Sequence, residues 1–398
     1  MRVNRQPLPY NIFRATATLV FLSIVLPLSA WHDVEESAYK AQLNDLRAHC
    51  HILKDAPEAD YFFFGMGNRT KLIYQKGKLS TLADGVVVHD FGPIEADTIM
   101  PDRYEVRVRL TNGQEQRIRE TEHGVYIGKR RVAGTGARLR LPSFAGHRYD
   151  RVLRVLHHEV LFNIQPDGSP LPNAELYQRP FYRDAAYAMM VLKATRNEHV
   201  MKPWATRLTS VYDHARSDDY EEADNIGQAL YVISPWGGKQ KAFRQQLLSE
   251  AERLAAAGAD GHKYITGLVD NMECPVYATA WLITGLVANG LDTAAYALPD
   301  LPDSYTDLCW WLPQRSSQNE AQIMSETFEW QTKKKNIRLY PYLNEARAHY
   351  YNDLRLMILS RASYPLTWEQ VWKEDGGYEC RTHLWAAAEL FLLIKTLS

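Results

Sequence analysis

Hydrophobic and polar positions follow two different periods along the chain. Over about residues 61–141, short runs of β-branched and aromatic residues alternate with turn residues, a pattern typical of strands. From about residue 149 onward, apolar residues recur at helical spacing in seven segments: RVLRVLHHEVLF, AAYAMMVLKAT, EEADNIGQALYVIS, KAFRQQLLSEAERLAAA, PVYATAWLITGLVANG, NEARAHYYNDLRLMILS and HLWAAAELFLLIKTLS. The pattern predicts an α+β fold, with a β-rich domain at residues 58–145 and a predominantly helical domain at residues 146–398.

Local signals add detail at the N-terminal side of this division. Asn112-Gly113 lies between two apolar runs and predicts a tight hairpin, because both residues tolerate the positive φ of a primed turn. Lys76-Gly77 predicts a similar turn. Residues 34–53 carry apolar positions at helical spacing among charges, so residues 31–57 are interpreted as a lead-in helix.

Several of the later helices are apolar nearly all the way round, as in AYAMMVL and VYATAWLITGLVA. Such helices are expected to be buried between other helices, and they are too short to be membrane spans. Weaker helices are expected near residues 200–213 and 303–312. The helical domain is therefore predicted to be a multi-helix core rather than a single layer.

The first 30 residues have the parts of a secretory signal. Arg2, Arg5 and Arg14 precede an apolar run over residues 15–28, and small residues follow at Ser29-Ala30. Leu28 is not the small residue preferred three positions before a cut after Ala30, so cleavage and retention as a signal anchor both remain open. In either case the protein is predicted to be exported, to the periplasm or the outside, with membrane contact only through such an anchor.

Composition narrows the classes of partner and cofactor. The formal net charge of -1 gives no electrostatic reason to expect nucleic acid or an anionic membrane surface. The four cysteines show no metal-ligand or redox spacing; Cys274 with Cys309 is a conceivable disulfide, and no pairing is assigned. Phosphate-binding loops and zinc-hydrolase or serine-hydrolase motifs are absent from the sequence, so neither a metal nor another cofactor is expected. The sequence does not indicate an oligomeric state.

Chemistry-bearing residues gather in the loops before the buried helices. Tyr182, Arg183 and Asp184 lead into AAYAMMVL, where Asp184 stands at the position of an N-cap. A carboxylate there can simply cap the helix. Alternatively, Arg183 positions a substrate oxygen and Asp184 transfers protons in a cleft at the N-terminal ends of the helices.

Two further acidic loops repeat this arrangement. Glu222, Asp224 and Asn225 precede IGQALYVIS, and close carboxylates repel, so one can retain its proton and serve as a general acid. A solvated acidic helix start explains the same residues. Asp270 lies just before Pro275, which fits the first turn of the next helix.

The remaining candidates are expected to bind rather than react. Asp307 stands beside the tandem Trp310 and Trp311, one of which is free to form a platform for a sugar ring. Asn68 and Arg69, in a glycine-rich turn between strands, are expected to reach a neighbouring cleft. His157-His158 has no partner signature and is interpreted as part of the core or the surface.

Successive buried helices with Tyr-Arg-Asp, Glu-x-Asp-Asn and Asp-Asn-x-Glu loops at their N-terminal ends resemble the six-hairpin glycosidase superfamily. The resemblance covers about residues 149–398 and implies an (α/α)6-toroid-like catalytic domain, although a full toroid has more helices than the seven clear segments. It implies glycoside hydrolysis of a polysaccharide or oligosaccharide by two opposed carboxylates. Asp184 and Asp270 are the first choice for this pair, with Glu222 or Asp224 as the competing choice.

Two other functions stay open at this point. A polysaccharide lyase would use Tyr182 as its base, with Arg183 and Asn225 neutralising a uronate carboxylate. A non-catalytic glycan-binding envelope protein would need none of these residues for chemistry. All three readings share a carbohydrate partner.

Overall fold

The computed structural model describes residues 28–48, 52–54, 58–134, 136, 138–270, 272–299, 358–367, 369–372 and 378–396. Internal contacts divide the chain into a short unit, residues 1–38, and a large unit, residues 39–398. All the architecture described below belongs to the large unit, apart from the first residues of helix α1 (Leu28–Ala48). No helix among the described residues is both long and apolar enough to cross a membrane.

The predicted lead-in helix ends earlier than expected. Helix α1 stops at Ala48, and residues Ile52–Lys54 form strand β1, which pairs in parallel with β15 (Ile358–Ser360). The last residues of the segment NEARAHYYNDLRLMILS are therefore strand rather than helix, and its earlier part lies outside the described residues. The helical pattern gave a wrong prediction for both segments, because each strand forms only by pairing with a partner about 300 residues away in sequence.

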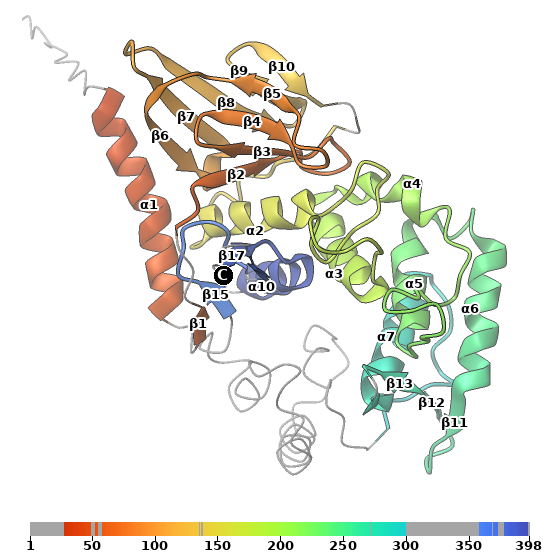
Figure 1. Ribbon diagram of the computed structural model, residues 1–398. Coiled ribbons are helices and arrows are strands. Elements are labelled where there is room, and N and C mark those ends of the chain that lie inside the picture. Colours follow the sequence, from red (N-terminus) through yellow and green to blue (C-terminus); the bar gives the residue numbers. More distant parts are fainter. Residues whose placement is uncertain are drawn as a thin grey trace, which may run out of the picture. The chain divides into compact units, whose positions relative to one another are not determined.

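Two antiparallel sheets follow, as Figure 1 shows in orange and gold. The first has the order β2-β3-β4-β5, and its strands are Tyr61–Phe64, Leu72–Gln75, Lys78–Thr81 and Val87–Asp90. The second has the order β10-β9-β8-β7-β6. Its strands, from β6 to β10, are Ile94–Met100, Glu105–Leu110, Glu115–Thr121, Gly124–Ile127 and Arg130–Ala133. The short helix η1 (Pro101–Arg103) lies between β6 and β7.

Both predicted hairpins are confirmed, but only the one at Lys76-Gly77 has the two positive φ values of a primed turn; at Asn112-Gly113 only the glycine has a positive φ. Lys76 and Gly77 join β3 to β4 with φ values of 46° and 78°, the left-handed region that a primed turn requires. Gly113 lies in the turn between β7 and β8 with a φ of 80°. Turn chemistry is encoded within two or three residues, so it was readable from the sequence alone.

Six of the seven predicted helices fall largely within the described residues. They are α2 (Asp150–Phe162), α3 (Tyr182–Thr195), α5 (Asn225–Ile233), α6 (Lys241–Leu254), α7 (Pro275–Ala288) and α10 (Leu384–Thr396). The weaker helix expected near residues 200–213 is only η2 (Glu198–Val200) and α4 (Lys202–Ala205), and η3 (Ser234–Trp236) follows α5.

Short hairpins connect and follow these helices. The tail of the predicted helix KAFRQQLLSEAERLAAA is strand β11 (Ala255–Ala257), which pairs with β12 (Lys263–Ile265). Strands β13 (Leu268–Val269) and β14 (Met272–Glu273) form a second hairpin, and β16 (Glu369–Trp372) pairs with β17 (Tyr378–Arg381). Alanine favours a helix and is depleted in strands, so the pairing of Ala255–Ala257 with β12 overrides the local preference.

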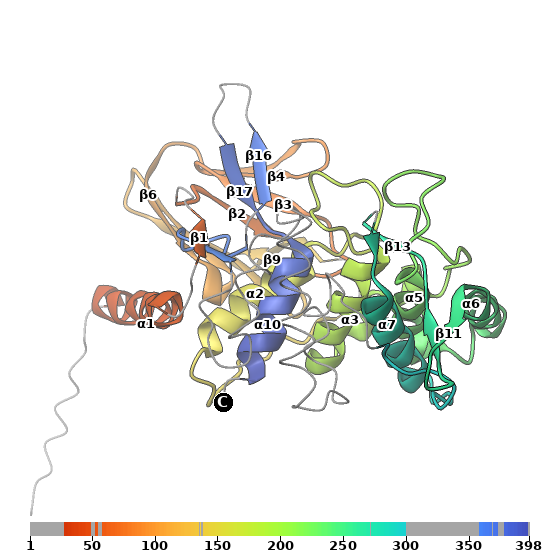
Figure 2. The same ribbon diagram turned by 90° about the horizontal axis from the view of Figure 1, so that it is seen from below.

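The helices pack in a series. Helix α10 contacts α2 and α3, α3 contacts α5, and α5 contacts both α6 and α7; Figure 2 shows α10 in blue between α2 and α3. Sheets followed by packed helices confirm the mixed α+β class.

Helix α2 joins the helices to the first sheet. Phe62, Phe63 and Phe64 of β2 are all fully buried, and the Phe63 ring stacks on Phe162 of α2 with centroids 4.4 Å apart. His158 lies 3.0 Å through Nε2 from the Phe63 carbonyl oxygen, and burial lowers its pKa to about 4. The interpretation of His158 as part of the core is therefore confirmed.

Helices α5 and α7 cross where two glycines meet. A Cβ at Gly285 would lie 2.5 Å from the Gly227 carbonyl oxygen, and a Cβ at Gly227 would overlap the backbone of Trp281 and Leu282. Backbone atoms in a packed helix cannot move aside cheaply, so only glycine allows this close approach. The crossing places the first turn of α5 against the second half of α7.

We expect Gly227→Ala to lower the free energy of unfolding by about 3 kcal/mol, because the added methyl group overpacks the α5–α7 crossing. Urea unfolding followed by circular dichroism measures the change. Gly238→Ala is the matched control, since a Cβ there meets no atom within 4 Å. Equal stabilities for the two variants would show that the helices can separate at little cost.

Candidate functional site

A buried arginine connects three parts of the helical region. Arg183 lies in the first turn of α3, and its Nη1 is 3.1 Å from Oδ2 of Asp270, at the turn of the β13–β14 hairpin. Its guanidinium carbon also lies 5.1 Å from the ring centroid of Trp385 in α10. A buried guanidinium group needs a charged or aromatic partner to offset its lost hydration. Arg183 therefore fixes α3, α10 and the hairpin relative to one another.

Asp270 is held by two arginines. It adopts a φ of 51°, a left-handed conformation that Asp tolerates better than most residues, and its side chain is fully buried. Arg216, from the irregular segment before α5, forms a second ion pair with it. Two guanidinium groups favour the ionised carboxylate, so Asp270 is the fixed negative charge of the cluster.

Two more buried carboxyl groups come from the start of α5. Oε1 of Glu222 accepts a hydrogen bond from the backbone N–H of Asp270 at 2.9 Å. Asp224 is the N-cap residue of α5, but its side chain does not cap the helix: Oδ2 accepts from Nε2 of Gln228 at 2.6 Å. Its other oxygen, Oδ1, is buried and has no hydrogen-bond partner within the described part of the chain.

Asp213 ties this group to α3. Its Oδ2 accepts from the backbone N–H of Tyr182 at 2.7 Å, and its own backbone N–H donates to Oδ1 of Asn225 at 3.0 Å. The segment before α5 is thereby attached to the start of α3 on one side and to the start of α5 on the other. We call Arg183, Asp213, Arg216, Glu222, Asp224 and Asp270 the Arg183 cluster.

Burial and charge set the protonation of the cluster. The pKa of Asp224 is raised to about 8, first by burial and then by the negative charge of Glu222, while Arg183 opposes the rise. Burial also raises the pKa of Asp213, and burial together with the charge of Arg183 lowers the pKa of His383 to about 4. The raised pKa therefore favours a protonated Asp224 at neutral pH.

The structure brings together most of the residues that the sequence singled out. Arg183, Glu222, Asp224 and Asp270 lie in one cluster, although Arg183 and Asp270 are 87 residues apart. Asp184 lies beside Arg183 in the first turn of α3 and is buried, but it is the third helical residue rather than the cap: the helix begins at Tyr182, with Phe181 at the N-cap. The expectation of an N-cap at Asp184 is therefore wrong, because the N-cap lies three residues earlier, at Phe181.

Tyr182 and Asn225 have structural contacts. The hydroxyl of Tyr182 donates to the Ser210 carbonyl oxygen at 2.7 Å, and burial together with the charge of Asp213 raises its pKa. Oδ1 of Asn225 accepts from the backbone of Asp213. Both side chains position the loop before α5 against the start of α3.

Sequence reasoning missed Asp213, Arg216, His383 and Trp385. Asp213 and Arg216 come from a segment without a periodic pattern, and His383 and Trp385 come from the far end of the chain. A local pattern carries no signal for contacts between such distant segments. Their roles follow only from the packing of α10 against α3.

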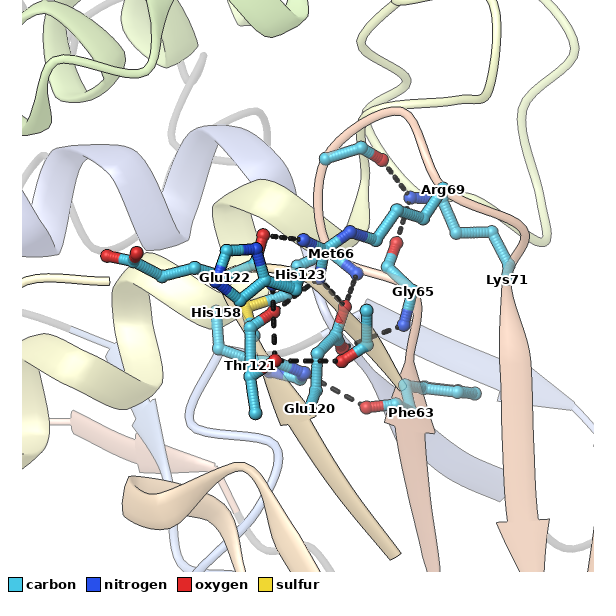
Figure 3. Close-up of polar contacts among 12 residues, drawn as sticks. Phe63, Gly65, Met66, Arg69, Lys71, Glu120, Thr121, Glu122, His123 and His158 are labelled. Carbon is cyan, nitrogen blue, oxygen red and sulfur yellow. Dashed lines mark hydrogen bonds and ion pairs between the residues drawn. The ribbon is translucent and has the colours of Figure 1, made fainter. Parts of the chain in front are cut away.

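Asn68 and Arg69 belong to a different region, the glycine-rich turn after β2, and Figure 3 shows the polar contacts of Arg69 there. Nη1 of Arg69 forms a buried ion pair with Oε1 of Glu120 at 2.9 Å, and the same carboxylate accepts from the backbone N–H groups of Gly65 and Met66. Nζ of Lys71 donates to the Gly67 carbonyl oxygen at 2.5 Å, and burial lowers its pKa to about 7. These contacts assign Arg69 to the internal support of the glycine-rich turn at residues 65–70.

Some predictions fall outside the described residues. Asp307, Trp310 and Trp311 are among them, as is Cys309, the conceivable partner of Cys274. Within the described part of the chain, no group of three or more His, Cys, Asp or Glu residues could hold a metal ion.

A hollow of about 840 Å³ lies along α6, away from the residues of the Arg183 cluster. It is lined by Thr209, Val211, Ala242, Gln245, Gln246, Ser249, Glu250 and Arg253. In the Arg183 cluster itself the side chain of Arg216 is 33% exposed, whereas those of Arg183 and Asp270 are 6% and 0% exposed. Arg216 is thus the side of the cluster that meets solvent.

Comparison with known proteins gave no match: no family model, no curated protein and no solved structure was significantly similar to this chain.

Proposed function

We propose that the protein is an exported glycoside hydrolase whose general acid is Asp224. The observation that carries the proposal is the buried carboxyl group of Asp224, one of whose oxygens has no hydrogen-bond partner in the described part of the chain. Burial and the charge of Glu222 raise the pKa of this group to about 8. Perturbed carboxyl groups of this kind are typical of sites that transfer a proton at neutral pH.

In this mechanism Asp224 donates its proton to the glycosidic oxygen as the bond to the anomeric carbon breaks. Glu222, whose negative charge raises the pKa of Asp224, is the ionised partner that activates water or attacks the anomeric carbon. Asp270 is a poorer base because Arg183 and Arg216 neutralise it. We therefore favour Glu222 and Asp224 over Asp184 and Asp270 as the reacting pair.

The other cluster residues would orient this pair. Arg183 holds Asp270, and the backbone of Asp270 holds Glu222, so a displacement of the arginine would shift the carboxylate two contacts away. Substrate would approach at Arg216, the exposed member. The packed helices α2, α10, α3, α5 and α7 would form part of a toroid-like domain with the cluster at the helix starts.

The lyase alternative has less support. Its base would be Tyr182, but the buried hydroxyl of Tyr182 already donates to the Ser210 carbonyl oxygen, and its pKa is raised rather than lowered. A tyrosine base needs the opposite shift to lose its proton near neutral pH.

The test is cleavage of a panel of neutral and acidic polysaccharides by the full chain. New reducing ends without ultraviolet absorbance from a C=C bond are the expected product. Asp224→Asn should lower the rate by about 10² to 10⁴, the usual contribution of a general acid. Asp260→Asn, a change at an exposed carboxylate between β11 and β12, should leave it unchanged.

Other outcomes would redirect the assignment. An unsaturated product would identify a lyase. Wild-type rates in Asp224→Asn would remove Asp224 from the chemistry. Binding without any cleavage across the panel would favour the non-catalytic glycan-binding class.

A further inference from the structure

One face of the five-stranded sheet is rich in arginine. Along β7 and β8 the residues alternate, so that Val106, Val108 and Ile118 are fully buried on one face, while Arg109 and Arg119 are exposed on the other. The outer face carries five arginines and two glutamates: Arg107, Arg109, Arg117, Arg119, Arg131, Glu105 and Glu115. We call these residues, together with Tyr126, the arginine face.

The two glutamates of this face are shared by two of the arginines. Oε1 of Glu105 lies 2.7 Å from Nε of Arg107 and 3.2 Å from Nε of Arg117, and Glu115 is 3.8 Å from Arg117. Arg107 and Arg117 stand directly opposite each other on neighbouring strands, an arrangement that repels unless an anion lies between them. Glu105 supplies that anion for one pair only.

The other three arginines are less closely paired, although Glu115 stands opposite Arg109 and Glu105 opposite Arg119 on the neighbouring strand. Within the described residues, Arg109, Arg119 and Arg131 form no ion pair, and all three side chains are exposed. Among the residues that the structure describes, only Arg107 and Arg117 form ion pairs on this face, so its five arginines and two glutamates leave an excess of positive charge. The near-zero net charge of the whole chain conceals this local excess.

An aromatic ring lies within the arginine face. Tyr126 of β9 pairs with Arg119 of β8 on one side and with Arg131 of β10 on the other, so all three share one row across the sheet. Adjacent strands are roughly 4.8 Å apart, which separates the two arginines by roughly 10 Å at the backbone. That distance is comparable to the length of two linked sugar rings. In this row, Arg119 and Arg131 can each bind an anionic group through two hydrogen bonds, and the ring of Tyr126 lies between them.

We infer that the arginine face binds an acidic polysaccharide, with carboxylate or sulfate groups on Arg119 and Arg131 and a sugar ring against Tyr126. The inference names the substrate class of the proposed hydrolase and rests on that function in choosing a polysaccharide over other polyanions. Guanidinium groups recognise carboxylate and sulfate through paired hydrogen bonds, and a sugar ring packs its apolar face on an aromatic side chain. The β-rich region would then hold the polymer while the Arg183 cluster cleaves it.

Affinity electrophoresis and fluorescence anisotropy with polygalacturonate test the inference without relying on cleavage. The double variant Arg119→Ser/Arg131→Ser should bind at least ten-fold more weakly at low salt, and Tyr126→Ala should also bind more weakly. The double variant Arg148→Ser/Arg207→Ser removes the same charge from exposed arginines elsewhere and should bind within two-fold of the wild type. Arg119→Lys/Arg131→Lys should lose affinity although it keeps the charge, because lysine cannot form the paired hydrogen bonds.

The binding and cleavage experiments distinguish failure of the arginine face from failure of the proposed hydrolase. Equal binding by Arg119→Ser/Arg131→Ser and the wild type would overturn the inference, as would tighter binding of single-stranded DNA than of polygalacturonate. Binding that depends on these residues, in a protein that cleaves no polysaccharide, would support the arginine face and defeat only the proposed hydrolase. Cleavage of neutral polymers without binding of polygalacturonate would defeat only the arginine face.

Discussion

Asp224→Asn is expected to increase the free energy of unfolding at pH 7 by about 4 kcal/mol while lowering the rate of hydrolysis by about 10² to 10⁴. The wild-type carboxyl group must take up a proton on folding at this pH, because its pKa rises from 3.8 in the unfolded chain to about 8 in the cluster. Asparagine has the same shape and carries no charge in either state. It therefore avoids the cost of burying the carboxyl group, and its Oδ1 can still accept from Gln228.

The effect of Asp224 on the free energy of unfolding depends on pH. A carboxyl group with a raised pKa contributes stability below its unfolded pKa, and that contribution is lost as the pH rises from about 4 to about 8. The difference between Asp224→Asn and the wild type should accordingly vanish near pH 3 and grow through neutral pH. Urea unfolding at a series of pH values measures it.

Asp260→Asn is the control, because that carboxylate is exposed and should give no pH-dependent difference of this size. A less stable Asp224→Asn at pH 7 would mean that the native state needs a charged Asp224, and the assignment of a general acid would fail. A more stable but inactive variant is the signature of a strained functional group.

Arg183→Met is expected to lower the free energy of unfolding by about 3 kcal/mol, the lower end of the usual cost of breaking a buried ion pair, because Arg216 still pairs with Asp270. The methionine fills much of the same space, but Asp270 then loses one of its two guanidinium groups. Arg183 also opposes the rise in the pKa of Asp224, so its removal makes ionisation of that carboxyl group still harder. The hydrolytic activity should fall with the displacement of Glu222.

A second substitution separates charge from packing. Arg183→Met/Asp270→Asn should recover at least half of the lost stability, because the uncompensated charge is gone and Arg216 is exposed enough to be solvated. Arg207→Met, which breaks an exposed ion pair with Asp167, should cost less than about 1 kcal/mol. Equal losses for the single and double variants would show that Arg183 matters for its packing against Trp385 rather than for its charge.

The sequence by itself determined the features that are encoded locally. The hairpins at Lys76-Gly77 and Asn112-Gly113, the order of sheets and helices, and the start of α7 at Pro275 follow from turn chemistry and periodicity within a few residues. It also selected Arg183, Glu222, Asp224 and Asp270, because polar groups directly before apolar helices must lie at helix ends.

Tertiary structure decided which of these residues meet and in what state. The pairing of β1 with β15, the addition of Asp213 and Trp385 to the site, and the placement of Arg69 in a separate network all join segments distant in sequence. The proton on Asp224 depends on how deeply α3, α5 and α10 enclose it, and enclosure is a property of packing that no local pattern contains.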